Sequence, residues 1–299
     1  QADMVYMILP ANSLAAAGDR LKRKMNRAVL VFDILDLWPE SLGGKKLQKL
    51  WPFQCWRRLR DDHLKAADLV ITECHYFQKF INAKQKKTAV VYWPKEVPEG
   101  WKMEAPENEA PETPAVIHFA YLGSINNIID IDGIVNFLEI TGKMTPVFLH
   151  VVGDGENRGL FEEKLKSKGI KAEFYGAVYE EAVKAEIFSR CMFGINMMKP
   201  GVCVGLTMKS IDYFCYGLPL VNNIPGDTWE LVKQEQIGIN YRPDAALKCA
   251  QELLALAQSD RLKEIKYKMQ SLYMKLFTQE AAENVIRERV FPLLEGGPK

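Results

Sequence analysis

The chain has 299 residues, which is enough for two domains with separate hydrophobic cores. Apolar residues make up 48% and charged residues 26%, as in an ordinary globular protein, and the formal net charge of +1 argues against a general nucleic-acid binder. The 6 cysteines contain no C-x-x-C pair, which favours free thiols over disulfides or a zinc site. We therefore expect a cytoplasmic protein without a signal peptide or a membrane span.

Short apolar runs in the first half predict buried parallel strands. They cover residues 4–9, 28–32, 69–72 and 88–92. Helical stretches separate them, and this alternation is typical of an α/β domain whose sheet is covered on both faces. A nucleotide-binding domain of this kind usually has more strands before its linker, so we expect the first strands of the domain to be missing from this sequence.

Carboxylates follow the second predicted strand. Asp33, Asp36 and Glu40 lie where that strand ends, and ligands of open α/β sheets bind beyond the carboxyl ends of the strands. One of these side chains is therefore a candidate general base or a ligand of acceptor hydroxyls. The alternative is that they cap the next helix. Trp38, in the same segment, offers a flat surface on which a sugar ring could stack.

Aromatic and basic residues alternate between residues 45 and 60. Phe53, Trp56 and Leu59 recur at helical spacing, with lysines and arginines around them. Such a helix suits the interface of an anionic membrane, which would place the protein at the inner face of that membrane. The alternative is a core-facing aromatic stripe with a solvated basic back.

The second half predicts a doubly wound parallel sheet. A Pro- and Glu-rich linker, 96–114, precedes it. Strands are expected near 116–122, 146–152, 172–175, 193–197, 218–223 and 237–240, with helices near 133–141, 158–167, 180–190, 207–216 and 227–235. The predicted domains are a partial acceptor-side domain at 1–95, the linker, a nucleotide-sugar domain at 115–279, and a C-terminal helix at 280–299 that packs back on the first domain.

The stretch from residue 199 to 223 carries the clearest functional signal. Thr207 is a suitable N-cap for a helix over 207–216. Unpaired N–H groups and the positive end of the helix dipole suit a phosphate there, and Lys209 adds a full charge. Asp212, one turn later, can accept hydrogen bonds from a diol such as a ribose. The alternative is a capped helix with a solvated Lys/Asp pair.

Glycines mark the carboxyl ends of several predicted strands of the second half. Gly123, Gly153 and Gly176 would let a ligand approach the backbone closely, although turns of α/β folds use glycine in any case. Carboxylates such as those of Asp130 and Asp132 have no third ligand in view, so no metal site is predicted.

Several segments resemble retaining glycosyltransferases with the GT-B fold, of the large family numbered four, in the bacterial branch that builds lipopolysaccharide and capsule. The matching segments of the second half are YLGSI (121–125), LHVVGDG (149–155), FYGAV (174–178) and GLTMKSIDYFCYGLPLV (205–221). Those of the first half are ADMVYMILP, FDILDLWPES and KAADLVITECHYF.

The resemblance implies two Rossmann-like domains facing across a cleft, the first incomplete here. It also implies metal-independent transfer of a hexose from a nucleotide sugar, with a UDP-sugar expected, to a glycan or lipid-linked acceptor, without a cofactor. Asp212 matches the family's ribose carboxylate, and the Tyr175–Val178 backbone matches the segment that holds the base. The expected catalytic residues are Lys209, Asp36 and Glu40. The expected donor-binding residues are Gly123, Ser124, Gly153, Asp154, Tyr175, Gly176, Val178, Lys199, Val204, Gly205, Leu206, Thr207 and Asp212.

The sequence departs from the family pattern at several positions. The family has a second carboxylate eight positions before Asp212, where this chain has Val204. Ser124 and Asp132 stand where the family has Arg and Lys, so phosphate charge would fall to Lys209 and Lys199. A second hypothesis is therefore a non-catalytic subunit that supports a partner enzyme. A third is a nucleotide-sugar epimerase, which would need paired carboxylates at its site.

Overall fold

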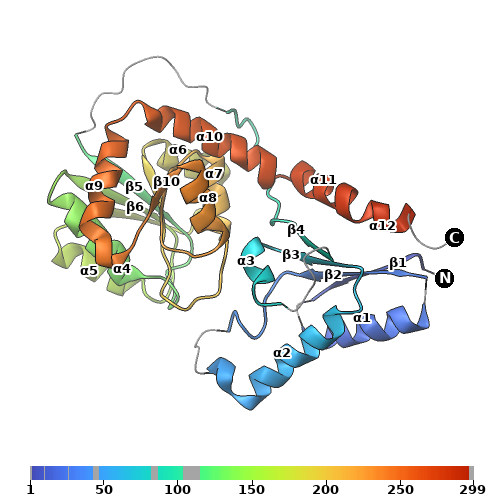
Figure 1. Cartoon of the computed structure of the whole chain (residues 1–299). Coiled ribbons are helices and arrows are strands. Elements are labelled where there is room, and N and C mark those ends of the chain that lie inside the picture. The colour runs from blue at the N-terminus through green and yellow to red at the C-terminus, as the bar shows by residue number, and fades with distance from the viewer. Residues whose placement is uncertain are drawn as a thin grey trace. The chain divides into compact units, whose positions relative to one another are not determined.

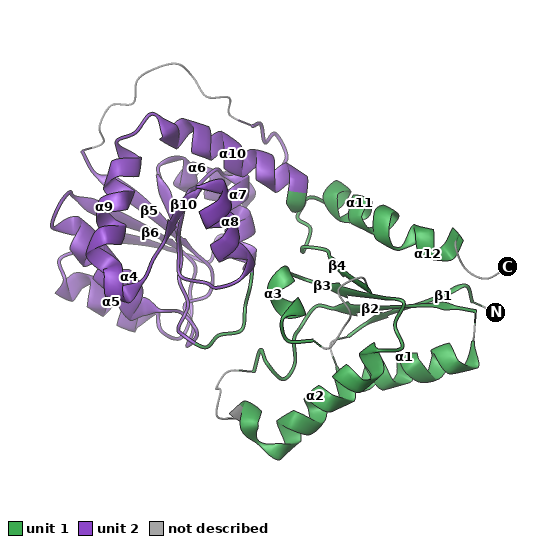
Figure 2. Cartoon of the chain, in the orientation of Figure 1, with its two compact units in different colours: residues 1–95, 201–205, 276–299 green, residues 96–200, 206–275 purple. Residues whose placement is uncertain are grey.

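The computed structural model describes residues 2–9, 11–25, 27–42, 47–81, 87–103 and 115–295 (Figure 1). Contacts divide the chain into two compact units (Figure 2). Unit 1 contains Gln1–Lys95, Gly201–Gly205 and Leu276–Lys299, and unit 2 contains Glu96–Pro200 and Leu206–Lys275. Lys45 and Lys46 of the aromatic-basic stretch and residues 104–114 of the predicted linker lie outside the described residues.

Unit 1 is built on a parallel sheet with the strand order β1-β2-β3-β4. Its strands are β1 Met4–Ile8, β2 Val29–Ile34, β3 Leu69–Thr72 and β4 Thr88–Val90. The connecting helices are α1 Ser13–Lys24, the short η1 Leu47–Lys49, α2 Trp51–Leu64 and α3 His75–Gln78. The parallel strands expected in the first half of the sequence are thus confirmed, because each neighbouring pair is hydrogen-bonded in parallel.

Successive side chains of β2 point to opposite faces of the unit 1 sheet, and both faces are apolar. Leu30 and Phe32 face one core cluster, which also contains residues of α1, α2 and α3, while Val29 and Val31 face the other. The second cluster is closed by Val290 and side chains of α11 Gln279–Arg289 and α12 Phe291–Glu295. Burial on both faces explains why these strands are continuous apolar runs.

Unit 2 contains a six-stranded parallel sheet with the order β10-β9-β8-β5-β6-β7. Its strands are β5 Ile117–Leu122, β6 Val147–Val152, β7 Lys171–Gly176, β8 Phe193–Asn196, β9 Leu220–Asn222 and β10 Gly238–Asn240. Its helices are α4 Ile131–Gly142, α5 Arg158–Ser167, α6 Glu181–Ser189, α7 Met208–Cys215, α8 Asp227–Glu235, η3 Pro243–Ala245, α9 Ala246–Ala257 and α10 Arg261–Leu276. The doubly wound sheet predicted from the alternation of apolar runs is confirmed.

The strand order of unit 2 reverses between β5 and β8, which are neighbours in the sheet but not in the sequence. In open α/β sheets a ligand crevice forms beyond the carboxyl ends of the strands at such a switch point. The loop after β5 and the segment from β8 to α7 are therefore the parts of unit 2 that the fold brings to a binding position. Within the described residues, no helix is long and apolar enough to cross a bilayer.

Candidate functional site

The loops after β5 and β6 interlock at the carboxyl edge of the unit 2 sheet. The N–H group of Ile125 donates to the carbonyl of Asp154 over 2.9 Å, and a Cβ atom at position 153 would collide with the carbonyl oxygen of Gly123. Gly153 and Gly155 are therefore required by the neighbouring loop, and not only by a ligand. Gly123 and Gly176 also have positive φ, but they differ in having open space where a Cβ would lie.

Asparagines at the ends of three neighbouring strands form a buried polar ladder. Asn196, Asn222 and Asn240 are the last residues of β8, β9 and β10, and Nδ2 of Asn196 and of Asn222 donates to Oδ1 of the next asparagine over 3.0 and 2.9 Å. The ladder continues into α7, because Asn196 also donates to Ser210 and accepts from the Thr207 hydroxyl. The Thr207 Oγ1 accepts from the Ser210 N–H, which confirms the predicted N-cap. The ladder therefore fixes the N-terminus of α7 to the sheet.

Tyr213 fixes the same helix to the switch point. Its ring packs where a side chain at Gly194 would otherwise lie, and its hydroxyl accepts from the N–H of Leu122 over 2.8 Å. The hydroxyl also lies 3.1 Å from the carbonyl oxygen of Ile195, so it joins β5 to β8. Sequence reasoning missed both the asparagine ladder and this tyrosine, although an asparagine at each strand end was a visible signal.

Lys209 lies in the first turn of α7 and is only 8% exposed. Its Nζ sits 4.7 Å from the centre of the Tyr121 ring, and among the described residues no carboxylate lies within ion-pairing distance. Burial lowers the pKa of Lys209 from its ordinary value to about 7. The solvated lysine of the alternative interpretation is therefore wrong. This ammonium group is desolvated, has no anion beside it, and is held near the β5 loop, since Tyr121 donates to the Ser124 carbonyl.

Asp212 is also buried, at 8% exposed, so the alternative interpretation of a solvated Lys/Asp pair is wrong for the aspartate as well. Its Oδ1 lies 3.6 Å from Nζ of Lys184, which pairs more closely with Glu181. Glu181 in turn accepts from the Tyr216 hydroxyl over 2.6 Å. Asp212 thus lies near the Lys184 cation, one turn beyond Lys209.

The remaining donor-site candidates of unit 2 lie on its loops. Asp154, Ser124 and Lys199 are exposed, and the Asp154 carboxylate accepts from its neighbour Gly155 N–H. The Tyr175 hydroxyl donates to Glu173 and contacts His150. Its side chain is therefore engaged, and the backbone is the part of Tyr175 that could bind the base of the nucleotide. This agrees with the expectation that the backbone through Gly176 and Val178 binds that base.

The segment before α7 belongs to two units. Leu206 and Thr207 are buried in unit 2, whereas Val204 and Gly205 fall in the part of the chain that clusters with unit 1. Cys203, within that part, packs in the unit 1 core beside residues of β2. The predicted domain of residues 115–279 did not include this excursion.

Carboxylates gather at the carboxyl edge of the unit 1 sheet. Asp33 ends β2 and accepts from the Tyr6 hydroxyl over 2.6 Å, while Asp36 is exposed. Glu73 follows β3, and burial, together with the charges of Asp36 and Asp33, raises its pKa to about 7. Glu73 can therefore hold or release a proton near neutral pH, and sequence reasoning missed it because nothing in the sequence reports the neighbours of a single glutamate.

Glu40 differs from the other carboxylates of this segment because it is buried in an ion pair. Its two oxygens accept from the Arg60 guanidinium over 2.9 and 3.1 Å, and Arg57 donates to it over 2.7 Å. Arg60 is 1% exposed, so it is unavailable to the surface of a membrane. This geometry favours a structural role for Glu40 over the expected catalytic one, because its lone pairs are already occupied by two cations.

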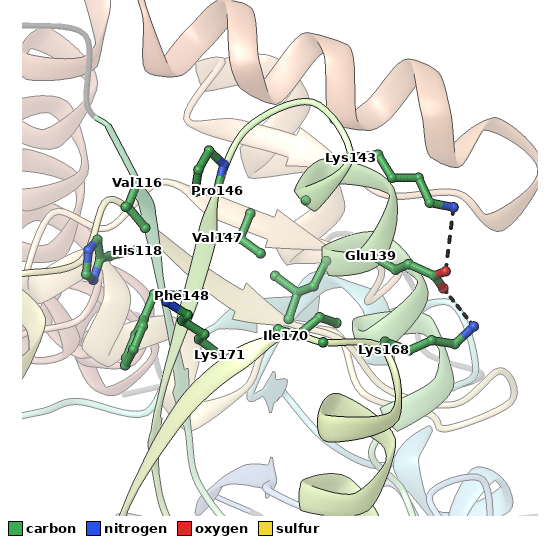
Figure 3. A pocket seen from close by; sticks show the side chains of 13 residues that line it. Val116, His118, Glu139, Lys143, Pro146, Val147, Phe148, Lys168, Ile170 and Lys171 are labelled. Atoms are coloured by element: carbon green, nitrogen blue, oxygen red, sulfur yellow. Dashed lines mark ion pairs between the residues drawn. The ribbon is translucent and has the colours of Figure 1, made fainter.

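A cavity of about 500 Å³ opens at the amino edge of the unit 2 sheet, away from the strand ends described above (Figure 3). Val116, Pro146 and Lys171 at the starts of β5, β6 and β7 line it, and Lys143 and Lys168 both pair with Glu139 at its side. No group of three or more metal-ligating side chains occurs in the part of the chain that the structure describes.

A row of hydrogen-bonded side chains crosses the sheet beside this cavity. His118 Nδ1 lies 2.8 Å from His150 Nε2, and His150 Nδ1 lies 2.8 Å from the Tyr175 hydroxyl. Burial, with the neighbouring His118, lowers the pKa of His150 to about 4. The His150 ring is therefore neutral near pH 7, which suits a structural hydrogen-bond row.

In sequence comparisons, no protein-family model and no curated protein matches the chain. Solved structures do match. One is the lipopolysaccharide outer core galactosyltransferase WaaB, with 15% identity and a TM-score of 0.66 over 97% of this chain and 75% of that chain. Another is the Anabaena protein HepE in complex with UDP-glucose, with 15% identity and a TM-score of 0.65 over 98% of this chain and 79% of that one.

A third similar structure is TarM of S. aureus, solved with UDP among its ligands. It has 12% identity and a TM-score of 0.59, over 97% of this chain and 55% of that chain. At such identities the similarity establishes the fold. The chain has an α/β fold with two parallel sheets that matches GT-B glycosyltransferase structures.

The buried ion pair yields a prediction about stability. Replacing Glu40 with Ala leaves the buried Arg60 with Asp61 as its remaining carboxylate partner, so we expect the free energy of unfolding to fall by about 3 kcal/mol, the lower end of the range for a broken buried ion pair. Urea unfolding followed by circular dichroism measures this change. The control is Asp36→Ala, an exposed carboxylate of the same segment, which should stay within about 0.5 kcal/mol of the parent. Equal effects of the two substitutions would contradict the assignment.

The N-cap yields a second prediction. Thr207→Val keeps the shape of the side chain but removes the cap to Ser210 and the hydrogen bond to Asn196. We expect a loss of about 1–3 kcal/mol of stability. Thr207→Ser retains the hydroxyl and should lose much less. If the two variants unfold at the same denaturant concentration, the ladder does not support α7.

Proposed function

We propose that the chain is a glycosyltransferase that takes a hexose from a nucleotide sugar, with a UDP-sugar as donor. The acceptor would be a glycan or a lipid-linked glycan of cell-surface polysaccharide synthesis, and transfer would need no metal. Unit 2 binds the donor, and unit 1 carries the groups for the acceptor. The observation that carries this proposal is Lys209, a buried ammonium group at the N-terminus of α7 and at the switch point of the sheet, with no carboxylate partner in the part of the chain that the structure describes.

Burying a cation without a counter-ion is costly, and this cost is why burial lowers the pKa of Lys209 to about 7. A diphosphate beside it would restore the charged form and satisfy the first-turn N–H groups of α7. Solved relatives of the same fold hold UDP-glucose or UDP, as their names state, which supports a nucleotide sugar as the anion. Asp212 is then one turn away to accept from the ribose hydroxyls, and the open glycines Gly123 and Gly176 leave room for the ligand.

The reaction requires the bond between the anomeric carbon and the diphosphate oxygen to break. The diphosphate leaves with the electron pair, and Lys209 and the helix N–H groups stabilise the negative charge that develops on it. An acceptor oxygen forms the new bond to the anomeric carbon and gives up its proton. Asp36 and Glu73 are the unit 1 carboxylates proposed to hold the acceptor hydroxyl and to take that proton, since Glu40 is committed to Arg60.

Val204 favours a second candidate function, because a valine stands where related enzymes have a carboxylate. The second candidate is a non-catalytic subunit that binds a nucleotide sugar and supports a partner enzyme. Release of UDP from UDP-hexoses in the presence of bacterial glycan acceptors would distinguish the two. Peripheral contact of the protein with a membrane through residues 45–60, at its cytoplasmic face, remains part of the proposal and rests on the exposed Leu50, Trp51 and Trp56.

The pH dependence of binding tests the role of Lys209. Below pH 7 the lysine is charged in the free protein, and above pH 7 binding must take up a proton to recharge it. We therefore expect the affinity for UDP-glucose to fall by up to about tenfold per pH unit above 7, until the raised pKa of the complex is reached. Calorimetry in buffers of different ionisation enthalpy measures this proton uptake. The diphosphate diester of UDP-glucose has no titrating proton above pH 7, so the slope reports the protein at every pH below the pKa of the uracil N3–H.

Lys209→Met is the matching variant. It should bind UDP-glucose at least tenfold more weakly at pH 7 and show no slope with pH. It should also be more stable than the parent at pH 7. The pKa of Lys209 is about 7 in the folded protein and 10.5 in the unfolded chain, so the charged lysine destabilises the folded state. This destabilisation is full below pH 7 and is lost as the pH rises towards 10.5. Weaker binding together with higher stability cannot result from misfolding. Unchanged affinity would remove Lys209 from the donor site.

Asp212→Asn tests the ribose contact. The amide keeps the shape of the side chain but replaces one acceptor oxygen with a donor, so we expect about tenfold weaker binding of UDP-glucose. UDP-glucose carries the ribose, whereas inorganic diphosphate lacks it, and the affinity for diphosphate should change much less. If both ligands weaken equally, Asp212 acts on the phosphates or on Lys209 and not on the ribose.

A further inference from the structure

Unit 1 contains a cavity of about 330 Å³ whose wall holds two tryptophan side chains. Its lining residues are Ala11, Asn12, Ser13, Trp38, Trp56 and Leu59. The first three lie where β1 leads into α1, and Trp38 lies in the segment after β2. Both are places where a parallel strand has just ended, so the cavity lies at the carboxyl edge of the sheet, the edge at which such folds bind ligands.

The two tryptophans are placed firmly and yet remain accessible. Trp38 and Trp56 are 36% and 46% exposed, and their ring centres are 6.1 Å apart at an angle of 39°. Nδ2 of Asn12 donates to the carbonyl oxygens of both residues, over 3.0 and 2.9 Å. The buried Arg60 donates to the Trp38 carbonyl over 2.8 Å, and Glu40 holds Arg60. The backbone under both rings is therefore fixed before any ligand arrives, which reduces the entropic cost of binding.

The lining of the cavity also offers hydrogen-bonding groups. The hydroxyl of Ser13 is exposed and makes no hydrogen bond with another described residue. The Asn12 side chain does not cap α1, and no acceptor for the Ser13 N–H lies among the described residues. None of the lining side chains is ionisable, which favours a neutral ligand over a phosphate or a uronic acid. Aromatic rings together with neutral polar groups in one cavity match a pyranose ring, which has an apolar C–H face and hydroxyls at its edge.

We infer that this cavity is a subsite for a neutral hexose ring that stacks on Trp38 and Trp56 and is hydrogen-bonded by Ser13. The inference rests on the proposed function, because the ring would be the sugar of the acceptor that receives the transferred hexose. It adds to that function the chemical class of the acceptor, a neutral glycan, and the residues that select it.

The test measures binding of methyl glycosides of glucose, galactose, mannose and N-acetylglucosamine to the full chain by saturation-transfer NMR and tryptophan fluorescence. At least one should bind, and Trp38→Ala and Trp56→Ala should each weaken that binding by tenfold or more. Trp38→Phe should retain part of it, because a smaller aromatic face remains. The matched control is Trp51→Ala, since Trp51 lies on the same helix as Trp56 and is 76% exposed but does not line the cavity.

UDP-glucose affinity, measured in parallel, separates this inference from the proposed function. The cavity variants should bind UDP-glucose as the parent does. Sugar binding that is insensitive to Trp38 and Trp56, or no binding of any methyl glycoside by the parent, would overturn the inference while leaving donor binding intact. An octyl glucoside that binds through these tryptophans when methyl glucoside does not would also overturn it, and would assign the cavity to an acyl chain.

Discussion

The donor site proposed for unit 2 depends on one buried charge. Lys209 and Arg60 are both removed from water, but the structure treats them differently. Arg60 has Glu40 within 2.9 Å, so the cost of burying its charge is offset inside the protein. Among the described residues Lys209 has no carboxylate partner, and its contact with the face of the Tyr121 ring offsets a small part of that cost. A fold keeps such an uncompensated cation most readily where a ligand completes it, and this contrast is why we place the anion at Lys209.

The rest of unit 2 can be understood as the support that keeps Lys209 in place. Without a rigid attachment, α7 could shift and let its lysine reach water, which would relieve the desolvation. The asparagine ladder and the Tyr213 hydroxyl prevent this. The ladder joins α7 to the ends of β8, β9 and β10, on one side of the switch point, and Tyr213 joins it to β5 and β8, on both sides. These are buried polar contacts in which every lost partner leaves an unsatisfied group, so they fix one geometry more strictly than apolar packing would.

The fold was largely predictable from the sequence, whereas the site was predictable only in part. Strands of a parallel sheet buried on both faces appear as apolar runs, and the runs at 116–122 and 69–72 correspond closely to β5 and β3. The N-cap at Thr207 was visible because capping depends on local sequence. The burial of Lys209, the pKa of Glu73 and the excursion of residues 201–205 into unit 1 depend on contacts between distant parts of the chain, which the local pattern does not report.

The carboxylates of unit 1 show that functional roles, too, depend on distant contacts that the local sequence does not report. A sequence places Asp36 and Glu40 after one strand and makes them equal candidates, since residue type and position are all it provides. Tertiary contacts then separate them: Glu40 becomes the counter-ion of Arg60, and Asp36 stays exposed beside Glu73, whose pKa it helps to raise. Because Arg60 also holds the Trp38 carbonyl, Glu40 still acts on the proposed acceptor subsite, but by positioning a tryptophan and not by moving a proton.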